Sequence, residues 1–377
     1  MMRPCPRSRM ALAAAWVKTR TARHSTSKSA SSSAISVSRK PCPSPKPALL
    51  TSTSTGRSKS ATRSATRAKS RAHAQISGQH LHPDPVCRSQ PPRRRLQSRC
   101  AGVARRPGRG LGYRGRMRIA TWNVNSIRSR IERVIPWLER SDVDVLAIQE
   151  TKTREDQFPF FRFEELGYEV AHHGCNQWNG VAIASRVGLT DVVAGFADAP
   201  LWGEATSAEA RHLGATSGGI RVNSLYVPNG RNILDPHMDY KIDWLGRLRD
   251  AAQGWLADGP SVLMGDWNIA PRDEDVWSME FYIDKSHVSP RERAAFAAIL
   301  DAGYVDLVRP LLPGPKVYTY WDYQQLRFQK GRGMRIDFVL GSPDVAARVT
   351  GAVIDREERK GKGASDHAPV IVELTDA

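Results

Sequence analysis

The chain has 377 residues, enough for one or two domains, and its 56 Lys and Arg against 38 Asp and Glu give a formal net charge of +18. Residues 1–116 hold 26 basic residues and one acid, Asp84, a net charge of +25; the other 30 basic and 37 acidic residues leave −7 for residues 117–377. This distribution excludes a uniformly basic nucleic-acid-binding domain. No stretch approaches the ~18 apolar residues of a transmembrane helix, so we expect no membrane-embedded segment.

Residues 1–116 are rich in Ser, Arg, Pro and Thr, and their apolar residues show no sustained period. We expect this stretch to be disordered, because it lacks the apolar surface that a core requires. It is typical of an organellar transit peptide, Met10–Val17 also allows a secretory signal, and its charge would suit a basic arm that binds nucleic acid. Met117 directly precedes the first predicted strand, so we favour a mis-assigned start and expect one domain over residues 117–377.

A strand and a helix open this domain. Met117–Asn123 is apolar and ends in a polar residue. The helix after it has apolar residues at spacings of three and four, namely Ile127, Ile131, Val134, Ile135 and Leu138. Pro136 should kink or end this helix, because proline lacks an N–H and clashes with the preceding turn.

Apolar runs predict the strands that follow. Val143–Glu150 is almost continuously apolar, as expected of a strand covered on both faces. Further strands are predicted at Gly180–Ser185, Gly219–Val227, Ser261–Asp266, Met334–Leu340 and Ala368–Leu374. Some strands alternate with helices and others follow one another directly, so the pattern indicates an α/β fold without requiring a simple doubly wound sheet.

Two later helices carry capping signals. Asp235 before Pro236 predicts an N-cap, with a buried stripe of Met238, Ile242, Leu245, Leu248 and Ala252. Ser289-Pro290-Arg291-Glu292 fits a capping box, and the helix that it opens should bury Phe296, Ile299 and Leu300.

Acidic, amide and imidazole side chains follow or interrupt five of the strands. They are Asn123, Glu150, Asp266 with Asn268, Asp337, and Asp366 with His367. Hydrolysis of a phosphodiester needs a charge-neutralising cation, a positioned water and donors for the transition state, and these residue types supply all three. The convergence therefore suggests a metal-dependent hydrolytic site.

Each cluster also has a structural interpretation. Glu150 could ligate a metal or simply pair with Lys152, and Asp266 with Asn268 could perform chemistry or build a turn. Asp337 is costly in an apolar strand unless it is paired; His367 is the natural partner, and a surface pairing with Arg335 is the rival. Tyr226 could donate to a phosphate or pack at the edge of the core. Taken together, the five clusters favour a hydrolytic site over five separate structural roles.

These motifs resemble exonuclease III, of the AP endonuclease branch of the endonuclease/exonuclease/phosphatase superfamily. The resemblance covers residues 117–377 in the family's order and leaves residues 1–116 unmatched. It rests on Trp122-Asn123-Val124-Asn125, Ile148-Gln149-Glu150-Thr151-Lys152, Tyr226-Val227-Pro228-Asn229-Gly230, Gly265-Asp266-Trp267-Asn268-Ile269-Ala270-Pro271, Met334-Arg335-Ile336-Asp337 and Ser365-Asp366-His367-Ala368-Pro369-Val370. It implies a four-layer α/β/β/α sandwich of the DNase I-like kind, and dependence on Mg²⁺ or Mn²⁺.

The resemblance also implies roles for individual residues. Glu150 would be the principal metal ligand, and the wider set of metal-site residues would be Asn123, Asp266, Asn268, Asp366 and His367. Asp266 would activate the attacking water or protonate the leaving group. The scissile phosphate would be held by Tyr226, Asn268 and by His367 paired with Asp337. Lys152 would position neighbouring carboxylates, and Asn229 would lie beside the substrate.

The substrate surface is likewise inferred from the resemblance. Tyr320, Trp321 and Met334 match the positions that line the family's pocket for a flipped abasic sugar, and extrusion is least costly where the base is missing. The loop with Arg327, Lys330, Arg332 and Arg335 is locally basic, as a surface that follows phosphates would be, although a solvated loop would look the same. Near the first strand, Arg128, Arg130 and Arg133 could add contacts.

The implied activity is that of a DNA-repair phosphodiesterase. It would cut 5′ to abasic sites, clear 3′ blocking groups and degrade duplex DNA from 3′ ends. We expect a monomer that acts on DNA and no membrane, in the cytoplasm of a bacterium, or in an organelle if residues 1–116 are a genuine transit peptide. The alternatives are a phosphodiesterase or phosphatase of the same fold that acts on a phospholipid or nucleotide, and an inactive DNA-binding protein.

Overall fold

The computed structural model describes residues 115–375. The predictions made for residues 1–116, a disordered extension with a targeting or DNA-binding role, lie outside the described residues except for Gly115 and Arg116, which are exposed.

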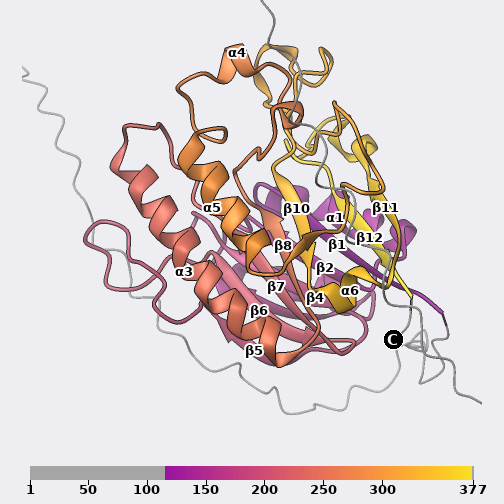
Figure 1. Cartoon of the computed structure of the whole chain (residues 1–377). Helices are drawn as coiled ribbons and strands as arrows, with labels where there is room; N and C mark the ends of the chain where they lie inside the picture. The colour runs from indigo at the N-terminus through magenta and orange to yellow at the C-terminus, as the bar shows by residue number, and fades with distance from the viewer. Residues whose placement is uncertain (1–114, 376–377) are drawn as a thin grey trace, which may run out of the picture. The chain divides into compact units, whose positions relative to one another are not determined.

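The described residues form two six-stranded sheets (Figure 1). The first has the order β11 (Val349–Ile354), β12 (Val370–Leu374), β1 (Met117–Asn123), β2 (Val145–Gln149), β4 (Val181–Ser185) and β3 (Glu169–His173). The second has the order β5 (Thr190–Ala194), β6 (His212–Ser217), β7 (Ile220–Tyr226), β8 (Ser261–Asp266), β10 (Asp337–Gly341) and β9 (Val305–Asp306). Each sheet has one parallel pair, β1–β2 or β7–β8, among antiparallel neighbours.

The sheets pack face to face, and helices cover their outer faces. Alternate strand residues such as Ile119 and Val262 point into one buried cluster between the sheets, because successive side chains of a strand face opposite ways. On the outer faces, α1 (Ile127–Ser141) and α2 (Phe160–Glu164) pack against the first sheet. The helices α3 (Pro236–Asp258) and α5 (Pro290–Asp301) pack side by side against the second (Figure 1). The predicted four-layer α/β/β/α fold is confirmed.

Short helical segments occupy the connections. They are α4 (Met279–Tyr282), α6 (Pro343–Ala346) and the 3₁₀ turns η1 (Glu155–Gln157), η2 (Asp273–Asp275), η3 (Gln324–Leu326) and η4 (Arg356–Arg359). Among residues 115–375, no helix combines the length and apolar character needed to cross a bilayer.

The capping predictions are confirmed. Asp235 accepts a hydrogen bond from His237 N at the start of α3, and Ser289 and Glu292 form a reciprocal capping box on α5. Of the predicted stripe on α3, Ile242 is only partly buried, whereas Lys241 is fully buried, which periodicity does not predict for a charged residue.

Helix α1 does not end at Pro136 but continues to Ser141. Pro136 and Glu132, whose carbonyl loses its N–H partner, are both exposed, so the lost hydrogen bond lies on the solvent side of the helix. The next turn buries Trp137 and Leu138, and Trp137 packs edge-on against Trp122 with a centroid distance of 5.2 Å. Burial of these two side chains outweighs the lost hydrogen bond.

The predicted strands are confirmed in position, with ends that differ by up to three residues. Met334 lies before β10 and makes isolated bridges to Val276 and Tyr320 instead of extending the strand. The edge strands β3, β5, β9 and β11 and the inner strand β6 were not predicted. The β5 and β9 segments are short and largely exposed, so they lack the apolar pattern that reveals a buried strand.

Candidate active site

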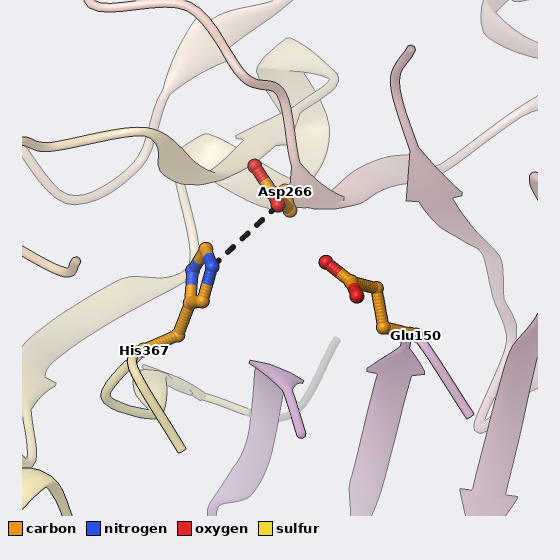
Figure 2. Close-up of side chains that lie close together, drawn as sticks. All are labelled: Glu150, Asp266 and His367. Carbon is orange, nitrogen blue, oxygen red and sulfur yellow. Dashed lines mark ion pairs between the residues drawn. The ribbon is translucent and has the colours of Figure 1, made fainter. Parts of the chain in front are cut away.

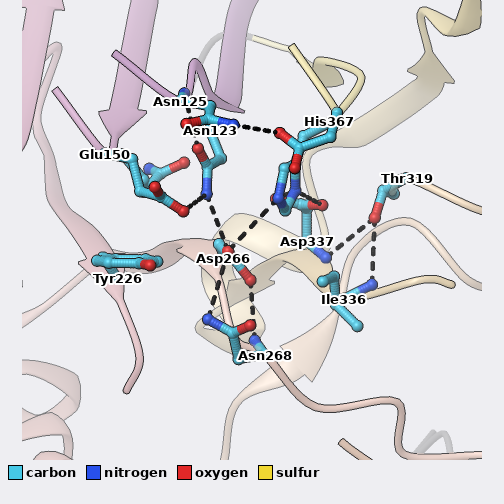
Figure 3. A network of polar contacts seen from close by, with 12 residues as sticks. Asn123, Asn125, Glu150, Tyr226, Asp266, Asn268, Thr319, Ile336, Asp337 and His367 are labelled. Atoms are coloured by element: carbon cyan, nitrogen blue, oxygen red, sulfur yellow. Dashed lines mark hydrogen bonds and ion pairs between the residues drawn. The ribbon is translucent and has the colours of Figure 1, made fainter. Parts of the chain in front are cut away.

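The topology brings the polar strand ends to one edge of the sandwich. In the parallel pairs, Asn123 ends β1 beside the end of β2, and Tyr226 at the end of β7 is opposite Asp266 at the end of β8. The antiparallel strand β10 begins at the same edge, where Asp337 is opposite Asp266. Side chains from both sheets therefore meet in one network (Figure 3).

Asn123 links the carboxylates of the two sheets. Its Nδ2 donates to Glu150 Oε1 and to Asp266 Oδ2, each at 2.9 Å. Lys152 Nζ lies 2.6 Å from Glu150 Oε2 and donates to Asn125 Oδ1, also at 2.6 Å. Burial raises the pKa of Glu150, but the charge of Lys152 and the bond from Asn123 outweigh it, so the net pKa is lowered and Glu150 is ionised.

Asp337 and His367 form the predicted buried pair. His367 Nδ1 lies 2.9 Å from Asp337 Oδ2, and the other ring nitrogen, Nε2, lies 3.7 Å from Asp266 Oδ2 (Figure 2). Burial lowers the pKa of His367, but Asp337 and Asp266 outweigh this effect and raise it to about 10. The imidazole is therefore protonated at neutral pH, with Nδ1 occupied by Asp337 and Nε2 aimed at the carboxylates.

Asp266 is the carboxyl group that titrates near neutrality. Burial raises its pKa, His367 lowers it, and the charges of Asp337 and Glu150 raise it again, to about 7. Its Oδ1 accepts from the backbone N–H of Asn268 at 2.9 Å, which fixes the carboxylate against the turn after β8. A buried acid with this pKa exchanges a proton readily at physiological pH.

Glu150, Asp266 and His367 form a candidate metal-holding group among the described residues. One ligand atom from each lies within 4.8 Å of the other two (Figure 2). Two carboxylates suit a hard divalent cation, which proteins typically bind through one or two such groups. Asp366 lies outside this group; its Oδ1 accepts from Asn125 Nδ2 at 3.0 Å. The donor chemistry therefore fits a metal at Glu150 and Asp266.

Three further predicted residues lie beside Asp266. Asn268 Nδ2 donates to the carbonyl of Val227 at 2.9 Å, and its Oδ1 accepts from Asn229 Nδ2 at 3.1 Å. The Tyr226 hydroxyl is hydrogen-bonded to Glu150, and burial followed by the charge of Glu150 raises the pKa of this hydroxyl well above its usual value. Tyr226 is therefore a neutral hydrogen-bond donor.

The backbone at the site is unusual. Asn125, Ser126, Glu150, Lys152 and Asn268 all have positive φ, between 45° and 88°. Non-glycine residues rarely adopt this conformation, and it costs about 1–3 kcal/mol each where the surroundings enforce it. The concentration of such residues where β1, β2 and β8 end indicates that the fold spends stability to aim these side chains.

The predicted pocket residues do not all lie in one environment. Tyr320 is partly buried with its ring centroid 4.8 Å from that of His367, and its backbone pairs with that of Met334, which is 4 % exposed. Trp321 is 1 % exposed and packs edge-on against Phe328, so it supports the loop from within.

Fewer basic side chains of the predicted loop reach the surface than its sequence indicates. Arg335 is buried and pairs with Asp306, with Nη2 to Oδ2 at 2.7 Å, so the expected alternatives of a phosphate contact or a surface pair with Asp337 are both wrong. Arg327 is also buried, with its guanidinium 4.6 Å from the Phe281 ring centroid. Arg332 remains partly exposed, over Trp277.

The arginines after β1 also differ from one another. Arg128 is exposed at the start of α1, and Arg130 donates to the carbonyl of Asn125 and to the Tyr323 hydroxyl. Arg133 donates to the carbonyls of Lys360 and Lys362, which holds the loop that leads to Asp366. Arg128 thus stays a predicted substrate contact, while Arg133 holds the neighbouring loop.

Sequence reasoning missed a buried group behind Asn268. His287 Nε2 lies 3.2 Å from Asn268 Oδ1, and Lys241 Nζ donates to the carbonyl of Asn268 at 2.7 Å and to Glu292 at 2.5 Å. The capping box had identified Glu292, but a lone histidine and a lysine within an amphipathic helix carry no signal that they are buried together.

Comparison with known proteins places this geometry among nucleases. The pattern of the Endonuclease/Exonuclease/phosphatase family matches residues 120–367. Exodeoxyribonuclease III of Haemophilus influenzae is 29 % identical over 274 residues, which cover 68 % of this chain and all of the relative. An AP endonuclease from Archaeoglobus fulgidus has a TM-score of 0.65 and 36 % identity, and the match covers 69 % of this chain and 100 % of that one.

A third similar protein was solved with nucleic acid. It is a 3′ phosphatase from Neisseria bound to a product DNA hairpin, with a TM-score of 0.65 and 36 % identity; the match covers 68 % of this chain and 99 % of that chain.

Proposed function

Because the chain belongs to the endonuclease/exonuclease/phosphatase family, we propose that it is a metal-dependent DNA-repair nuclease that cuts 5′ to abasic sites, clears 3′ blocking groups and degrades duplex DNA from 3′ ends. One observation carries the proposal: Glu150, Asp266 and the Asp337–His367 pair meet at one sheet edge, beside the amides of Asn268 and Asn229. The relatives that are exodeoxyribonucleases and AP endonucleases support DNA as the substrate, and a phospholipid or nucleotide is not favoured.

Glu150 is the proposed principal metal ligand, with Asp266 beside it and Asn123 aligning both carboxylates. A bound Mg²⁺ or Mn²⁺ would neutralise charge on the scissile phosphate. Lys152 keeps Glu150 ionised, so the carboxylate is ready to bind a cation. Asp366 and Asn268 complete the proposed set around the metal, Asp366 being oriented by Asn125. His367, which the sequence analysis placed in this set, is an imidazolium without a lone pair for a cation, so it is proposed to lie beside the metal as a hydrogen-bond donor.

Asp266 is the proposed proton-transferring group. With a pKa of about 7 it is suited to accept a proton from the attacking water or to give one to the leaving 3′ oxygen. His367 is held as an imidazolium by Asp337, so its Nε2–H is a fixed, charged donor for a phosphate oxygen. Asp337 therefore acts through His367.

The neutral donors complete the phosphate site. The Tyr226 hydroxyl and the Nδ2 groups of Asn268 and Asn229 are proposed to donate to non-bridging phosphate oxygens as charge accumulates in the transition state. The contact of Asn268 Nδ2 with Asp266 Oδ2 is long for a hydrogen bond, at 3.4 Å, and a phosphate oxygen would replace Asp266 as the acceptor.

Substrate selection is assigned to the surface around this centre. Tyr320 and Met334 would face a flipped abasic sugar, with Trp321 supporting them, and Arg128, Lys152 and Arg332 would contact the DNA near the site. We further propose that the protein acts as a monomer on duplex DNA, not at a membrane, and in the bacterial cytoplasm.

The test is incision of a duplex oligonucleotide that carries one abasic-site analogue. Wild type should cut 5′ to the lesion with Mg²⁺ and not with EDTA, and Asp266→Asn should lose ~10²-fold or more of the rate, since proton transfer contributes 10²–10⁴-fold. Asp250→Asn, an exposed change on α3, is the matched control and should cut like wild type. Absence of both incision and 3′ digestion from a folded wild-type protein would refute the proposed function.

A further inference from the structure

His287 is a buried side chain that the proposed chemistry leaves without a role. It is 9 % exposed in the segment between α4 and α5, and its Nε2 faces two residues of the phosphate site. The distances are 3.2 Å to Asn268 Oδ1 and 3.4 Å to Asn229 Nδ2. Among residues 115–375, His287 is the histidine whose ring contacts both asparagine side chains.

The surrounding hydrogen bonds determine how the two amides are oriented. Asn268 Nδ2 donates to the carbonyl of Val227, so Asn268 Oδ1 is the atom that faces His287. Asn229 Oδ1 accepts from the backbone N–H of Arg231 at 3.1 Å, so its Nδ2 is the atom that faces Asn268. Each assignment rests on a backbone partner whose donor or acceptor character is fixed.

This orientation specifies the tautomer of His287. An amide oxygen can only accept, so the 3.2 Å contact with Asn268 Oδ1 is a hydrogen bond only when Nε2 carries a hydrogen; Asn229 Nδ2, at 3.4 Å from Nε2, then donates to Asn268 Oδ1 and not to the ring. The other nitrogen, Nδ1, lies 3.0 Å from the Ser286 hydroxyl, whose single hydrogen is shared between two acceptors, Nδ1 and the carbonyl of Arg231 at 3.2 Å. With the shorter contact to Asn268 as the hydrogen bond, the neutral ring has its hydrogen on Nε2 and a lone pair on Nδ1, and the Ser286 hydroxyl donates to Nδ1.

The backbone of His287 is held in place at a cost. Its φ is 83°, a strained value for a residue with a bulky side chain. The backbone N–H donates to Glu292 Oε1 at 2.9 Å, and the carbonyl accepts from Ala270 N at 2.7 Å. Glu292 also binds Lys241, which in turn donates to the carbonyls of Asn268 and Asn229. One buried ion pair thus anchors the histidine and both asparagines together.

Resting on the proposed function, we propose that His287 is a positioning residue: its Nε2–H fixes Asn268 Oδ1, so that the amide N–H₂ groups of Asn268 and Asn229 point to the scissile phosphate. Without this donor, Asn268 Oδ1 keeps only the bond from Asn229, and the Asn268 amide gains freedom to rotate. A misaimed donor weakens stabilisation of the transition state, whereas duplex binding depends mainly on backbone phosphates elsewhere. The effect should therefore fall on kcat and not on KM.

The kinetic test compares two substitutions in the full chain on the abasic duplex. His287→Phe removes the donor and should lower kcat by ~10- to 100-fold, as loss of an outer partner of an active-site group typically does, with KM changed by less than ~3-fold. His287→Gln keeps an N–H near the position of Nε2 and should recover most of the loss. Equal kcat values for the two variants, whether both wild-type or both low, would overturn the proposal.

A matched control pair separates positioning from general packing. His212 is also a buried histidine bonded to an asparagine, with Nε2 3.0 Å from Asn223 Oδ1, but its ring stacks on Trp255 of α3 instead of facing the amides of the phosphate site. His212→Phe should lower stability, but the kcat values of His212→Phe and His212→Gln should be equal. If the Phe and Gln variants differed in kcat as much at His212 as at His287, the proposal would be overturned, because any buried histidine would then produce the effect.

The tautomer gives a readout that does not depend on activity. ¹⁵N NMR of the histidine rings at neutral pH, with the His287 signal identified by its absence in His287→Phe, should show a hydrogen on Nε2. A hydrogen on Nδ1 alone would overturn the proposal even if the enzyme is active. An inactive wild type with Nε2 protonated would instead count against the proposed function, leaving the orientation of the asparagines as inferred.

Discussion

Lys241 and Glu292 form an ion pair in the protein interior, and both side chains are 0 % exposed. Lys241 Nζ makes three hydrogen bonds, to Glu292 and to the carbonyls of Asn229 and Asn268. Substitution of Lys241 by Met preserves the approximate shape of the side chain and removes the charge. It leaves Glu292 buried without its cation and leaves the two carbonyls without a donor.

The expected loss is large. Removal of one partner of a buried ion pair costs about 3–5 kcal/mol of unfolding free energy, because the remaining charge is uncompensated. Burial lowers the pKa of Lys241 more than Glu292 raises it, which shows that desolvation of the lysine is only partly repaid. The double variant Lys241→Met/Glu292→Gln, which removes both charges, should therefore be more stable than Lys241→Met alone.

The ion pair should also make the free energy of unfolding depend on pH in the acidic range. Burial raises the pKa of Glu292, but Lys241 outweighs this effect, and the folded-state pKa is lower than in the unfolded chain. The stabilisation is then fully present above the unfolded value near 4.5 and is lost as the pH falls through the lower folded value. The double variant should lose less stability over this acid range than wild type.

Urea unfolding at neutral pH measures these differences. The control is Arg247→Met on the same helix, where the exposed pair with Asp243 spans 3.4 Å and should contribute only about 0–0.5 kcal/mol. If Lys241→Met lost no more free energy than Arg247→Met, the inference that this buried pair anchors the asparagine loops would be refuted.

Further expectations concern packing, metal, DNA and the domain boundary. Gly265→Ala should unfold at least about 2 kcal/mol more easily in urea, because its φ is 157° and a Cβ would lie 1.9 Å from the carbonyl oxygen of Leu225; wild-type stability would contradict this. Glu150→Gln should need a higher Mg²⁺ concentration for half-maximal incision, and an unchanged Mg²⁺ titration would argue against Glu150 as the ligand. Arg332→Ala should reduce the slope of log K against log salt by about one, measured by duplex binding, and an unchanged slope would exclude a phosphate contact. A protein of residues 117–377 should incise like the full chain, and loss of activity in that shortened protein would refute the predicted boundary.

Local patterns in the sequence were sufficient to predict an α/β fold, whereas its four layers were implied by the family resemblance. Apolar runs identified most of the buried strands but not β6, Asp235 and Ser289 marked the helix starts, and polar residues after the strands located the site. These signals are local, because periodicity and capping depend on neighbours within a few residues. The roles proposed for Glu150, Asp266 and His367 needed the family resemblance as well, since each residue alone also had a structural interpretation.

The partners of the polar side chains were decided only by the tertiary structure. Asn123 contacts Asp266 across 143 positions, and His367 contacts Asp337 across 30, because the two sheets place their strand ends at one edge. Burial was misjudged for the same reason: Arg335 and Lys241 lie in the interior because distant acids neutralise them there. A charged residue can be buried only where the fold supplies its partner, and that partner is not a local property of the sequence.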